Sequence, residues 1–430
     1  MIVEVSSANS RLEQAEPKTA QGLGNPTSAF PPTEIQTALL TGGFDPAYAF
    51  GLAMALIAKG VSLDMIGSDD IDRPELHSTP KLNFLNLQGD KGQHGSRAGK
   101  ISAMLAYYGR LFRYTRAAKA KVFHVLWNAK FEMFDRTLLM LFYKLNGKKI
   151  VLTAHNVNAA KRDGVDTWLN RATLKVQYRC ADHIFVHTEK MKLELLREFG
   201  VRERAVTVIP FGINNSVPDT DLTPEQAKRR LGIGEGEKTL LFFGNIGPYK
   251  GLEFLVEAFQ KIAATNPQYR LIIAGKARGG CQQYLEEIQN LISRDPSRDR
   301  VLQKIEYIPD EDTELYLKAA DVLVLPYRHI FQSGVLILGY TFGLPVVAAD
   351  VGSLRDDIIE GSTGFLCKPC DAKDLAAALE KYFASGLFQQ LSARRQQIRD
   401  YAKARHSWDL VGEMTGKVYA QLLAESPENA

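Results

Sequence analysis

The sequence predicts an α/β protein with two doubly wound domains, each built around a parallel sheet. Three observations support this fold class. The chain has 430 residues, its short apolar runs alternate with longer stretches of helical spacing, and this alternation stops in one polar segment and then begins again. Parallel strands need crossover helices, so a repeated strand and helix pattern is typical of parallel sheets.

The length predicts the number of domains. A chain of 430 residues exceeds the roughly 100 to 200 residues of an ordinary domain, so two globular units are expected. Hydrophobic residues make up 45% of the chain and charged residues 24%. This composition is typical of a globular protein and excludes collagen-like, coiled-coil and largely disordered chains.

The first 34 residues are expected to form a disordered tail. They are polar, mixed in charge and rich in proline, with Pro17, Pro26, Pro31 and Pro32. They lack the basic start and apolar run of a secretory signal. The longest apolar stretch, residues 47–58, is shorter than the roughly 20 residues that span a bilayer. We therefore expect a cytoplasmic protein without a transmembrane helix.

The alternation places the individual elements. In the first half, β-branched or apolar runs predict strands at residues 37–41, 63–67, 83–87, 122–126, 150–153, 183–187 and 206–210. Residues 47–59 and 170–181 have clear helical spacing. In the second half, strands are predicted at residues 239–243, 270–274, 301–307, 322–325, 346–349 and 365–368. Between the halves, residues 216–238 are rich in proline and glycine and form the predicted linker. A helix at residues 406–424 ends the chain.

The four cysteines, Cys180, Cys281, Cys367 and Cys370, are few for so long a chain and suit a reducing compartment. Cys367 and Cys370 have the spacing of half a zinc or redox site. No Cys or His cluster supplies a second pair of ligands, so we interpret the pair as part of an ordinary loop. The net charge of +4 is too small to predict a nucleic-acid partner.

One glycine-rich loop in the second half has the features of a phosphate-binding loop. It follows a predicted strand and contains Gly244, Asn245, Gly247 and Lys250. Ligands of open parallel sheets bind at the carboxyl ends of strands, where glycines let backbone amides approach an anion and a lysine neutralises it. Such turns are common, so this loop alone is a weak signal.

Two further loops add to it. Arg328 and Gln332 lie in a loop that ends with Ser333, Gly334 and Val335 at the start of a predicted helix. Free amides and the helix dipole favour a diphosphate there, although Ser333 acting as a plain N-cap is an equally good interpretation. A third loop contributes Lys276 and Arg278. Together the three loops predict an anion site at one sheet edge.

At these residues the chain resembles glycosyltransferase family 4, the retaining nucleotide-sugar transferases of the GT-B fold. Residues 244–251 are similar to the glycine loop of the family, and residues 321–352 to its donor-site strand, loop, helix and strand. The resemblance runs from about Ile35 to the C-terminus. It implies two Rossmann-like domains facing a cleft. The acceptor domain would comprise residues 35–215 and the nucleotide-sugar domain residues 216–405, with residues 406–430 forming a helix that packs back on the first.

The resemblance also implies roles for individual residues. Residues 152–157 are similar to the strand-end histidine motif of the family, so His155 would line the cleft and act with Lys250 as a catalytic residue; a buried structural histidine is the alternative. The donor diphosphate would contact Gly244, Asn245, Gly247, Lys250, Arg328, Gln332, Ser333, Gly334 and Val335. The base would lie near Ile308 and Pro309, and Gly42 and Gly43 would form an acceptor loop. Lys250, Arg328 and the amides of Ser333 and Gly334 would stabilise the charge on the leaving phosphate, so no metal or other cofactor is expected. Asp219 and Asp221, which have the spacing of a metal motif, lie in the linker.

Two departures from the family pattern stand out. Asn245 occupies the place of an arginine, and Ile330 and Leu338 stand where two glutamates usually contact the sugar ring and the ribose. Some relatives have the Gln-Ser-Gly-Val sequence found at residues 332–335, so activity is still expected. The sugar and the base stay open.

The resemblance implies retaining transfer of a hexosyl group from a nucleotide-diphosphate sugar to an acceptor hydroxyl, of the bacterial exopolysaccharide or lipid-linked-sugar type. Residues 101–150 contain ten basic and two acidic residues interspersed with aromatic ones. Such a segment suits anionic lipid headgroups, which favours a polyprenyl-diphosphate sugar as acceptor and a peripheral position on the inner face of the cell membrane. A solvated basic face over a buried aromatic core is an equal alternative.

Other functions fit the sequence less well or need assays to separate them. A dinucleotide oxidoreductase is disfavoured because residues 39–46 lack the Gly-x-Gly-x-x-Gly pattern after their strand. A non-catalytic GT-B protein that binds a sugar nucleotide or serves as a partner subunit fits the missing glutamates. A nucleotide-sugar epimerase with the same fold is a third possibility.

Overall fold

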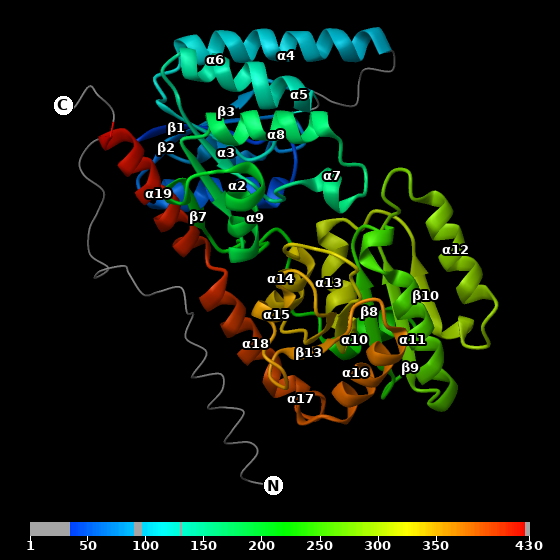
Figure 1. Ribbon diagram of the computed structural model, residues 1–430. Helices are drawn as coiled ribbons and strands as arrows, with labels where there is room; N and C mark the ends of the chain where they lie inside the picture. The colour runs from blue at the N-terminus through cyan, green and yellow to red at the C-terminus, as the bar shows by residue number, and fades with distance from the viewer. Residues whose placement is uncertain (1–34, 90–96, 130, 426–430) are drawn as a thin grey trace. The chain divides into compact units, whose positions relative to one another are not determined.

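The computed structural model describes residues 35–89, 97–129 and 131–425, so the predicted tail at residues 1–34 lies outside the described residues. The described chain divides into two compact units (Figure 1). Of the described residues, the N-terminal unit contains 35–212 and 407–425, and the C-terminal unit contains Ile213–His406. No helix of the described residues is both long enough and apolar enough to cross a membrane.

A seven-stranded sheet forms the centre of the N-terminal unit. Its strand order is β3-β2-β1-β4-β5-β6-β7, and all neighbouring pairs are parallel. Strands β4 and β6 are buried along their whole length, as expected where helices cover both faces of a sheet. The strands are β1 (Gln36–Leu40), β2 (Ser62–Gly67), β3 (Leu82–Asn86), β4 (Val122–Val125), β5 (Lys149–Thr153), β6 (His183–Val186) and β7 (Val206–Val208).

The helices of this unit connect the strands. They are α2 (Pro46–Ala58), α3 (Pro74–Ser78), α4 (Arg97–Ala117), α5 (Glu132–Phe134), the π-helical turn η1 (Asp135–Leu139), α6 (Met140–Leu145), α7 (Ala159–Arg162), α8 (Trp168–Cys180), α9 (Glu189–Phe199) and η2 (Glu203–Ala205). The aromatic residues Tyr107 and Tyr108 of α4 and the aliphatic Leu111 form part of the core. Arg110 and Lys148 donate to backbone carbonyls, so part of the predicted basic face has a structural role.

The last helix, α19 (Trp408–Ala424), packs against α2 in the N-terminal unit, as the sequence predicted. Its first residue, Trp408, lies over two glycines: a β-carbon on Gly51 would come 2.3 Å from the indole ring, and one on Gly212 would come 2.4 Å from it. Further along, the hydroxyl of Tyr419 lies 2.6 Å from Nδ1 of the buried His124, and Nε2 of His124 lies 2.7 Å from Thr153 Oγ1. This helix is therefore fixed to the middle of the sheet.

The C-terminal unit contains a six-stranded sheet in the order β10-β9-β8-β11-β12-β13, again with parallel neighbours. Its strands are β8 (Lys238–Phe243), β9 (Tyr269–Ala274), β10 (Val301–Lys304), β11 (Val322–Leu325), β12 (Val346–Ala349) and β13 (Gly364–Cys367). Its helices are α10 (Pro224–Arg230), η3 (Pro248–Lys250), α11 (Leu252–Thr265), α12 (Gln282–Ser293), η4 (Arg298–Arg300), α13 (Asp310–Ala319), α14 (Gly334–Thr341), α15 (Leu354–Asp357), α16 (Ala372–Ala384), α17 (Gly386–Gln389) and α18 (Leu391–Arg405). The two sheets confirm the predicted pair of Rossmann-like domains.

One predicted strand was too long. The run at residues 301–307 forms a strand only over Val301–Lys304. This strand is at the edge of the sheet and pairs with β9 alone, and Lys304 is opposite Ala274, the last residue of β9. Beyond that point the chain has no partner strand, so apolar sequence alone cannot extend the pairing.

Candidate active site

In the C-terminal unit, the loops after β8 and β11 flank the point where the strand order reverses, which is where open parallel sheets bind ligands. Gly244 follows β8 and has φ of +95°, a left-handed conformation that favours glycine. A β-carbon on Gly244 would lie 3.1 Å from Nζ of Lys250 and 3.4 Å from Cγ2 of Val335. Gly244 thus brings the glycine loop and the start of α14 together.

Other contacts hold the three predicted loops against one another. Gly251, with φ of +63°, packs so closely on the loop after β11 that a β-carbon would be 2.2 Å from the carbonyl oxygen of Pro326. The Arg328 amide donates to the Tyr249 carbonyl at 2.9 Å. On the other side, a β-carbon on Gly275 would be 2.0 Å from the Gly244 carbonyl oxygen. These approaches require glycine and form one continuous loop cluster.

Lys250 is buried in this cluster, with 5% of its surface exposed. Its Nζ lies 3.4 Å from the Phe243 carbonyl oxygen and 5.4 Å from the centre of the Tyr327 ring. Burial lowers the pKa of Lys250 to about 8. Among the described residues no carboxylate pairs with this ammonium. A buried cation without an acidic partner is disfavoured unless an anion binds beside it.

The start of α14 offers backbone amides. Ser333 caps the helix, because its Oγ accepts from the Leu336 amide at 3.3 Å. The next two amides, of Gly334 and Val335, are in the first turn and have no hydrogen-bond partner in the part of the chain that the structure describes. The Tyr327 hydroxyl lies 3.4 Å from Ser333 Oγ, so Tyr327 contacts both the predicted cation and the predicted cap. The two interpretations of this loop are therefore compatible: Ser333 acts as an N-cap, and the amides beside it are free.

Two of the side chains that were predicted to contact the diphosphate form hydrogen bonds with other side chains of the protein. Arg328 donates from Nε to Glu253 at 2.8 Å, and its guanidinium lies 5.0 Å from the centre of the Phe254 ring. Gln332 donates to Asp357 at 3.2 Å and accepts from Ser353 Oγ at 2.8 Å. A donor could reach either side chain only after an exchange of partners, so their contacts with the diphosphate stay predictions.

The remaining donor-side residues lie in the same unit. Asn245 is exposed and Gly247 is buried. Ile308 is buried, while Pro309 directly precedes α13. The exposed ring beside them belongs to Tyr307, and its centre lies 5.0 Å from Nζ of Lys276. Tyr307 therefore offers an exposed aromatic surface next to Ile308 and Pro309, where the base of the donor was predicted to lie.

In the N-terminal unit, the strand order reverses between β1 and β4, and the loops after these strands contact each other. Gly42 and Gly43 have φ of +60° and +73°. A β-carbon on Gly42 would lie 2.6 Å from the Trp127 carbonyl oxygen. The predicted acceptor loop is thus held against the loop after β4.

His155 lies in the loop after β5 and stacks on Trp127, with ring centroids 4.2 Å apart and planes 5° apart. Its Nδ1 lies 3.1 Å from Nε2 of His187. Its Nε2 is shielded and has no hydrogen-bond partner among the described residues. Burial, together with His187, lowers the pKa of His155 well below its ordinary value. The ring is therefore neutral near pH 7 and suited to hydrogen bonding with a hydroxyl rather than to supplying charge.

A cavity of about 260 Å³ adjoins this histidine. It is lined in part by Phe44, Trp127, Asn128, Arg136, His155 and Gln177. The amides of Asn128 and Gln177 pair at 2.8 Å, and Arg136 donates to Asn170 at 2.9 Å. Aromatic walls with amide and guanidinium groups are typical of a site for a polar, hydroxyl-bearing ligand. Phe44, the residue after the predicted glycines, lines this cavity.

Two family models match the chain, one after the other. The model described as "Glycosyltransferase Family 4" matches residues 47–217, and that described as "Glycosyl transferases group 1" matches residues 224–405. The chain belongs to glycosyltransferase family 4. The first match ends at residue 217 and the second begins at residue 224, a few residues after the boundary between the two structural units at Gly212 and Ile213. The protein is thus a glycosyltransferase, as predicted.

Similar proteins agree with this family. The glycosyltransferase is 28% identical to the D-inositol 3-phosphate glycosyltransferase of Corynebacterium aurimucosum, over 88% of this chain and 90% of that protein. It is 29% identical to the glycogen synthase of Mycobacterium tuberculosis over 63% and 62% of the two chains. Among solved structures, sucrose-phosphate synthase from Thermosynechococcus elongatus superposes with a TM-score of 0.73 at 22% identity, covering 91% of this chain and 100% of that one. Anabaena HepE, solved with UDP and glucose, gives 0.68 at 17% identity, covering 91% and 100%.

The departures of this glycosyltransferase from the family pattern have a structural context. Leu338 is 7% exposed in α14 and contributes to the core. Ile330 is half-buried, and a β-carbon on Gly352 would lie 1.9 Å from its carbonyl oxygen. Neither side chain can accept a hydrogen bond from a sugar hydroxyl. Any polar contact with the sugar has to come from other residues of this transferase.

Several residues of the loop clusters were missed in the sequence. Glu253, which holds Arg328, carried a signal, since acidic residues are favoured in the first turn of a helix. Tyr327 lies in the loop after β11, and its contacts with Lys250 and Ser333 depend on the packing of two loops. Trp127 and His187 contact His155 from the loops after β4 and β6, and nothing in their local sequence indicates this.

Proposed function

We propose that this glycosyltransferase moves a hexosyl group, with retention of anomeric configuration, from a nucleotide-diphosphate sugar to an acceptor hydroxyl. One observation supports the donor site above others. Gly244, the buried ammonium of Lys250 and the start of α14 meet at the carboxyl edge of one sheet. A positive charge beside amides without partners is what a departing diphosphate requires.

In this proposal the bond between the anomeric carbon and the diphosphate oxygen breaks, and negative charge grows on that oxygen. Lys250 and the amides of Gly334 and Val335 stabilise the charge. The acceptor oxygen bonds to the anomeric carbon from the face that the diphosphate leaves, and its proton passes to the departing phosphate. No carboxylate nucleophile is assigned. The chain's own cation and dipoles carry the stabilisation, so no metal enters the step.

The base of the donor is proposed to lie beside Tyr307, Ile308 and Pro309, where an exposed ring can stack on it. The solved complexes of Anabaena HepE contain UDP or UDP-glucose, which makes UDP-glucose the first donor to assay. The acceptor is proposed to bind in the cavity beside His155, where a neutral imidazole orients a hydroxyl.

We further propose that the enzyme acts at an anionic membrane surface, on a lipid-linked sugar or polysaccharide precursor. Leu138, Leu141 and Leu145 follow one another at helical spacing and are 61%, 46% and 87% exposed. On the neighbouring helix α4, Ile101 and Leu105 are also exposed. Helices α4 and α6 lie side by side (Figure 1), with the rings of Phe112 and Phe142 4.7 Å apart.

Exposed cations accompany these leucines. Arg113 and Arg116 line a groove with Phe112, and both are exposed. Apolar side chains flanked by arginine suit the boundary between acyl chains and anionic headgroups. Flotation with phosphatidylglycerol vesicles tests the surface: L145E should lower the bound fraction, and L193E, which changes an exposed leucine of α9, should not. Equal flotation of the two variants, or equal binding to uncharged vesicles, would contradict membrane binding.

The transfer itself is tested with a panel of UDP-, GDP- and ADP-sugars. Nucleotide diphosphate release and product formation are measured with wild type and K250A, and the anomeric configuration of the product is read by NMR. Inversion would contradict retention.

The second candidate, a non-catalytic sugar-nucleotide-binding protein, is favoured by the apolar Ile330 and Leu338, and it predicts a donor-induced rise in melting temperature without transfer or hydrolysis.

A further inference from the structure

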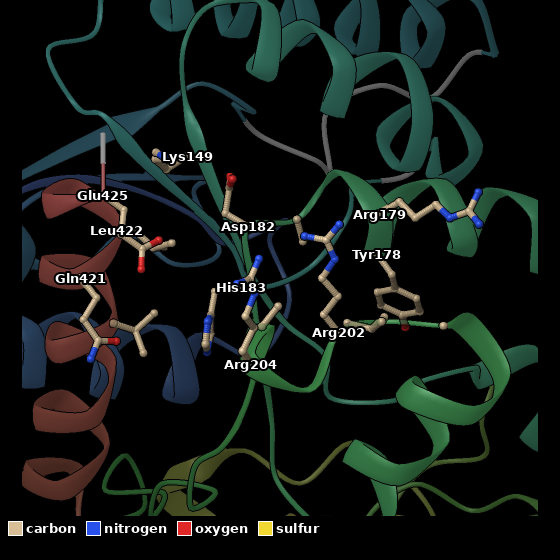
Figure 2. A pocket seen from close by; sticks show the side chains of 15 residues that line it. Lys149, Tyr178, Arg179, Asp182, His183, Arg202, Arg204, Gln421, Leu422 and Glu425 are labelled. Atoms are coloured by element: carbon tan, nitrogen blue, oxygen red, sulfur yellow. The ribbon is translucent and has the colours of Figure 1, made fainter. Parts of the chain in front are cut away.

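A second pocket, of about 780 Å³, lies at the opposite edge of the N-terminal sheet from His155. Lys149 and His183 are the first residues of β5 and β6, and Ala205 directly precedes β7. Helix α19 forms the other wall with Val418, Gln421 and Leu422. Figure 2 shows α19 on one side and Asp182, Arg202 and Arg204 on the other. The loops of the candidate active site follow the carboxyl ends of strands, whereas this pocket lies where the strands begin. The two sites are therefore separate.

The pocket has an excess of positive charge. Its cationic residues are Lys149, Arg179, Arg202 and Arg204, and its acidic residues are Asp182 and Glu425. Asp182 is already neutralised, since its Oδ2 accepts from the Ile150 amide at 2.6 Å and pairs with Lys144 at 2.5 Å.

By contrast, none of the four cationic side chains forms a hydrogen bond or ion pair with any residue that the structure describes. Arg179 extends away from α19 (Figure 2). Lys149, Arg202 and Arg204 are therefore the cations left to meet a ligand.

The other walls add shape and polarity. Val201, Val418 and Leu422 supply apolar surface, and the amide of Gln421 can donate and accept. His183 contributes no charge near pH 7, because burial lowers its pKa to about 4, and its Nε2 lies 2.9 Å from Thr207 Oγ1. The volume is in the range of roughly 300 to 1,000 Å³ of small-molecule sites, more than an isolated phosphate needs.

We propose that this pocket binds a phosphorylated small molecule, with the phosphate on Arg202, Arg204 and Lys149 and an organic body against Val418 and Leu422. A phosphomonoester carries about −1.5 to −2 charges at neutral pH, which matches the unpaired cations. Arginine guanidinium groups bind phosphate in a bidentate manner. The ligand joins α19 to the loop before β7. Since α19 begins at Trp408, one residue after the boundary at His406 and Ser407, the ligand also stabilises the packing of this helix on its unit.

Calorimetric titration of the full chain with glucose 6-phosphate tests the proposal, with glucose as the uncharged counterpart. Wild type should bind the phosphate ester, more weakly as salt increases, and glucose should give no heat. R202Q/R204Q should weaken binding at least about tenfold, since two charge-assisted contacts are lost. The control K175Q/R197Q removes the same charge from exposed residues of α8 and α9 outside the pocket and should bind as wild type does. Equal affinity of all three proteins, or no binding to wild type, overturns the proposal.

Two further experiments distinguish this pocket from other sites or ligands that could give the same binding signal. G334P, which alters the proposed donor site, should bind glucose 6-phosphate normally; loss of binding there together with normal binding by R202Q/R204Q would place the ligand at the donor loops and overturn the assignment. Vesicles containing phosphatidylglycerol form the second arm. If flotation depends on Arg202 and Arg204 while glucose 6-phosphate does not bind, the pocket takes lipid headgroups and the small-molecule proposal is wrong.

Discussion

A single methyl group on Gly244 would come within 3.1 Å of the ammonium nitrogen of Lys250. The pair therefore sets both the shape and the charge of the proposed donor site. The left-handed backbone at Gly244 adds a second requirement for glycine.

G244A should lower kcat/KM for the nucleotide-sugar donor by one to two orders of magnitude, roughly 1.4 to 3 kcal/mol of transition-state stabilisation, because the methyl group displaces Lys250. Steady-state kinetics measures the loss. The matched control is G236A: Gly236 also has a positive φ, of +81°, but no atom lies within 4 Å of its added β-carbon. Both variants should lose about 1 kcal/mol of stability, and G236A should keep its activity. Equal kinetic losses would show that backbone strain, and not the contact with Lys250, matters.

Replacement of Lys250 by methionine should separate stability from activity. Burial lowers the pKa of Lys250 to about 8, below its unfolded value, so the unfolded chain binds more protons between these two values and stability rises with pH there. Near pH 7 the buried ammonium costs up to roughly 3 kcal/mol. K250M should therefore raise the free energy of unfolding at pH 7, with a smaller gain at pH 10, while transfer is lost.

Denaturant unfolding at the two pH values checks the stability of K250M. For wild type, kcat/KM should fall as pH rises above about 8, because the free enzyme then loses the ammonium charge. An unchanged rate for K250M would remove Lys250 from the mechanism, and a stability gain that is the same at both pH values would contradict its burial as an ammonium.

The amide of Gly334 can be removed without breaking α14. Gly334 is the first residue of this helix, and Ser333 before it has an extended backbone, with φ of −120° and ψ of 106°. Proline is tolerated at such a position. G334P should weaken donor binding about 10- to 100-fold, as expected for one hydrogen bond to a charged group. G334A keeps the amide and should bind nearly as wild type does. Titration with UDP and UDP-glucose measures both, and similar affinities for the two variants would exclude this amide from the site.

His155 should affect transfer and leave nucleotide affinity unchanged. Its neutral ring and its shielded Nε2 suit a hydrogen bond to a sugar or acceptor hydroxyl. H155A should lower kcat about tenfold or more, since one hydrogen bond is lost, while UDP affinity changes by less than about twofold. The control H77A removes an exposed histidine that pairs with Asp72 and should change neither value. A loss of UDP affinity in H155A that matches its loss of rate would indicate a general structural role.

The sequence determined the helices and strands, and it indicated the strand ends at which functional residues lie. Glycines, a lysine and a serine before a helix were recognisable because local backbone demands select these residue types. The alternation of strands and helices indicated parallel sheets, and the last helix was correctly expected to return to the N-terminal unit. These features depend on neighbours in the chain.

Only the tertiary structure decided how the charged groups are paired. Lys250 is buried against Tyr327, whereas Arg328, in the same loop as Tyr327, is held by Glu253 from α11. The pairing of Asp182 with Lys144 leaves Arg202 and Arg204 among the unpaired cations of a pocket that no sequence motif indicated. Charge compensation depends on distances across strands and loops that are far apart in sequence, so residue order alone does not specify it.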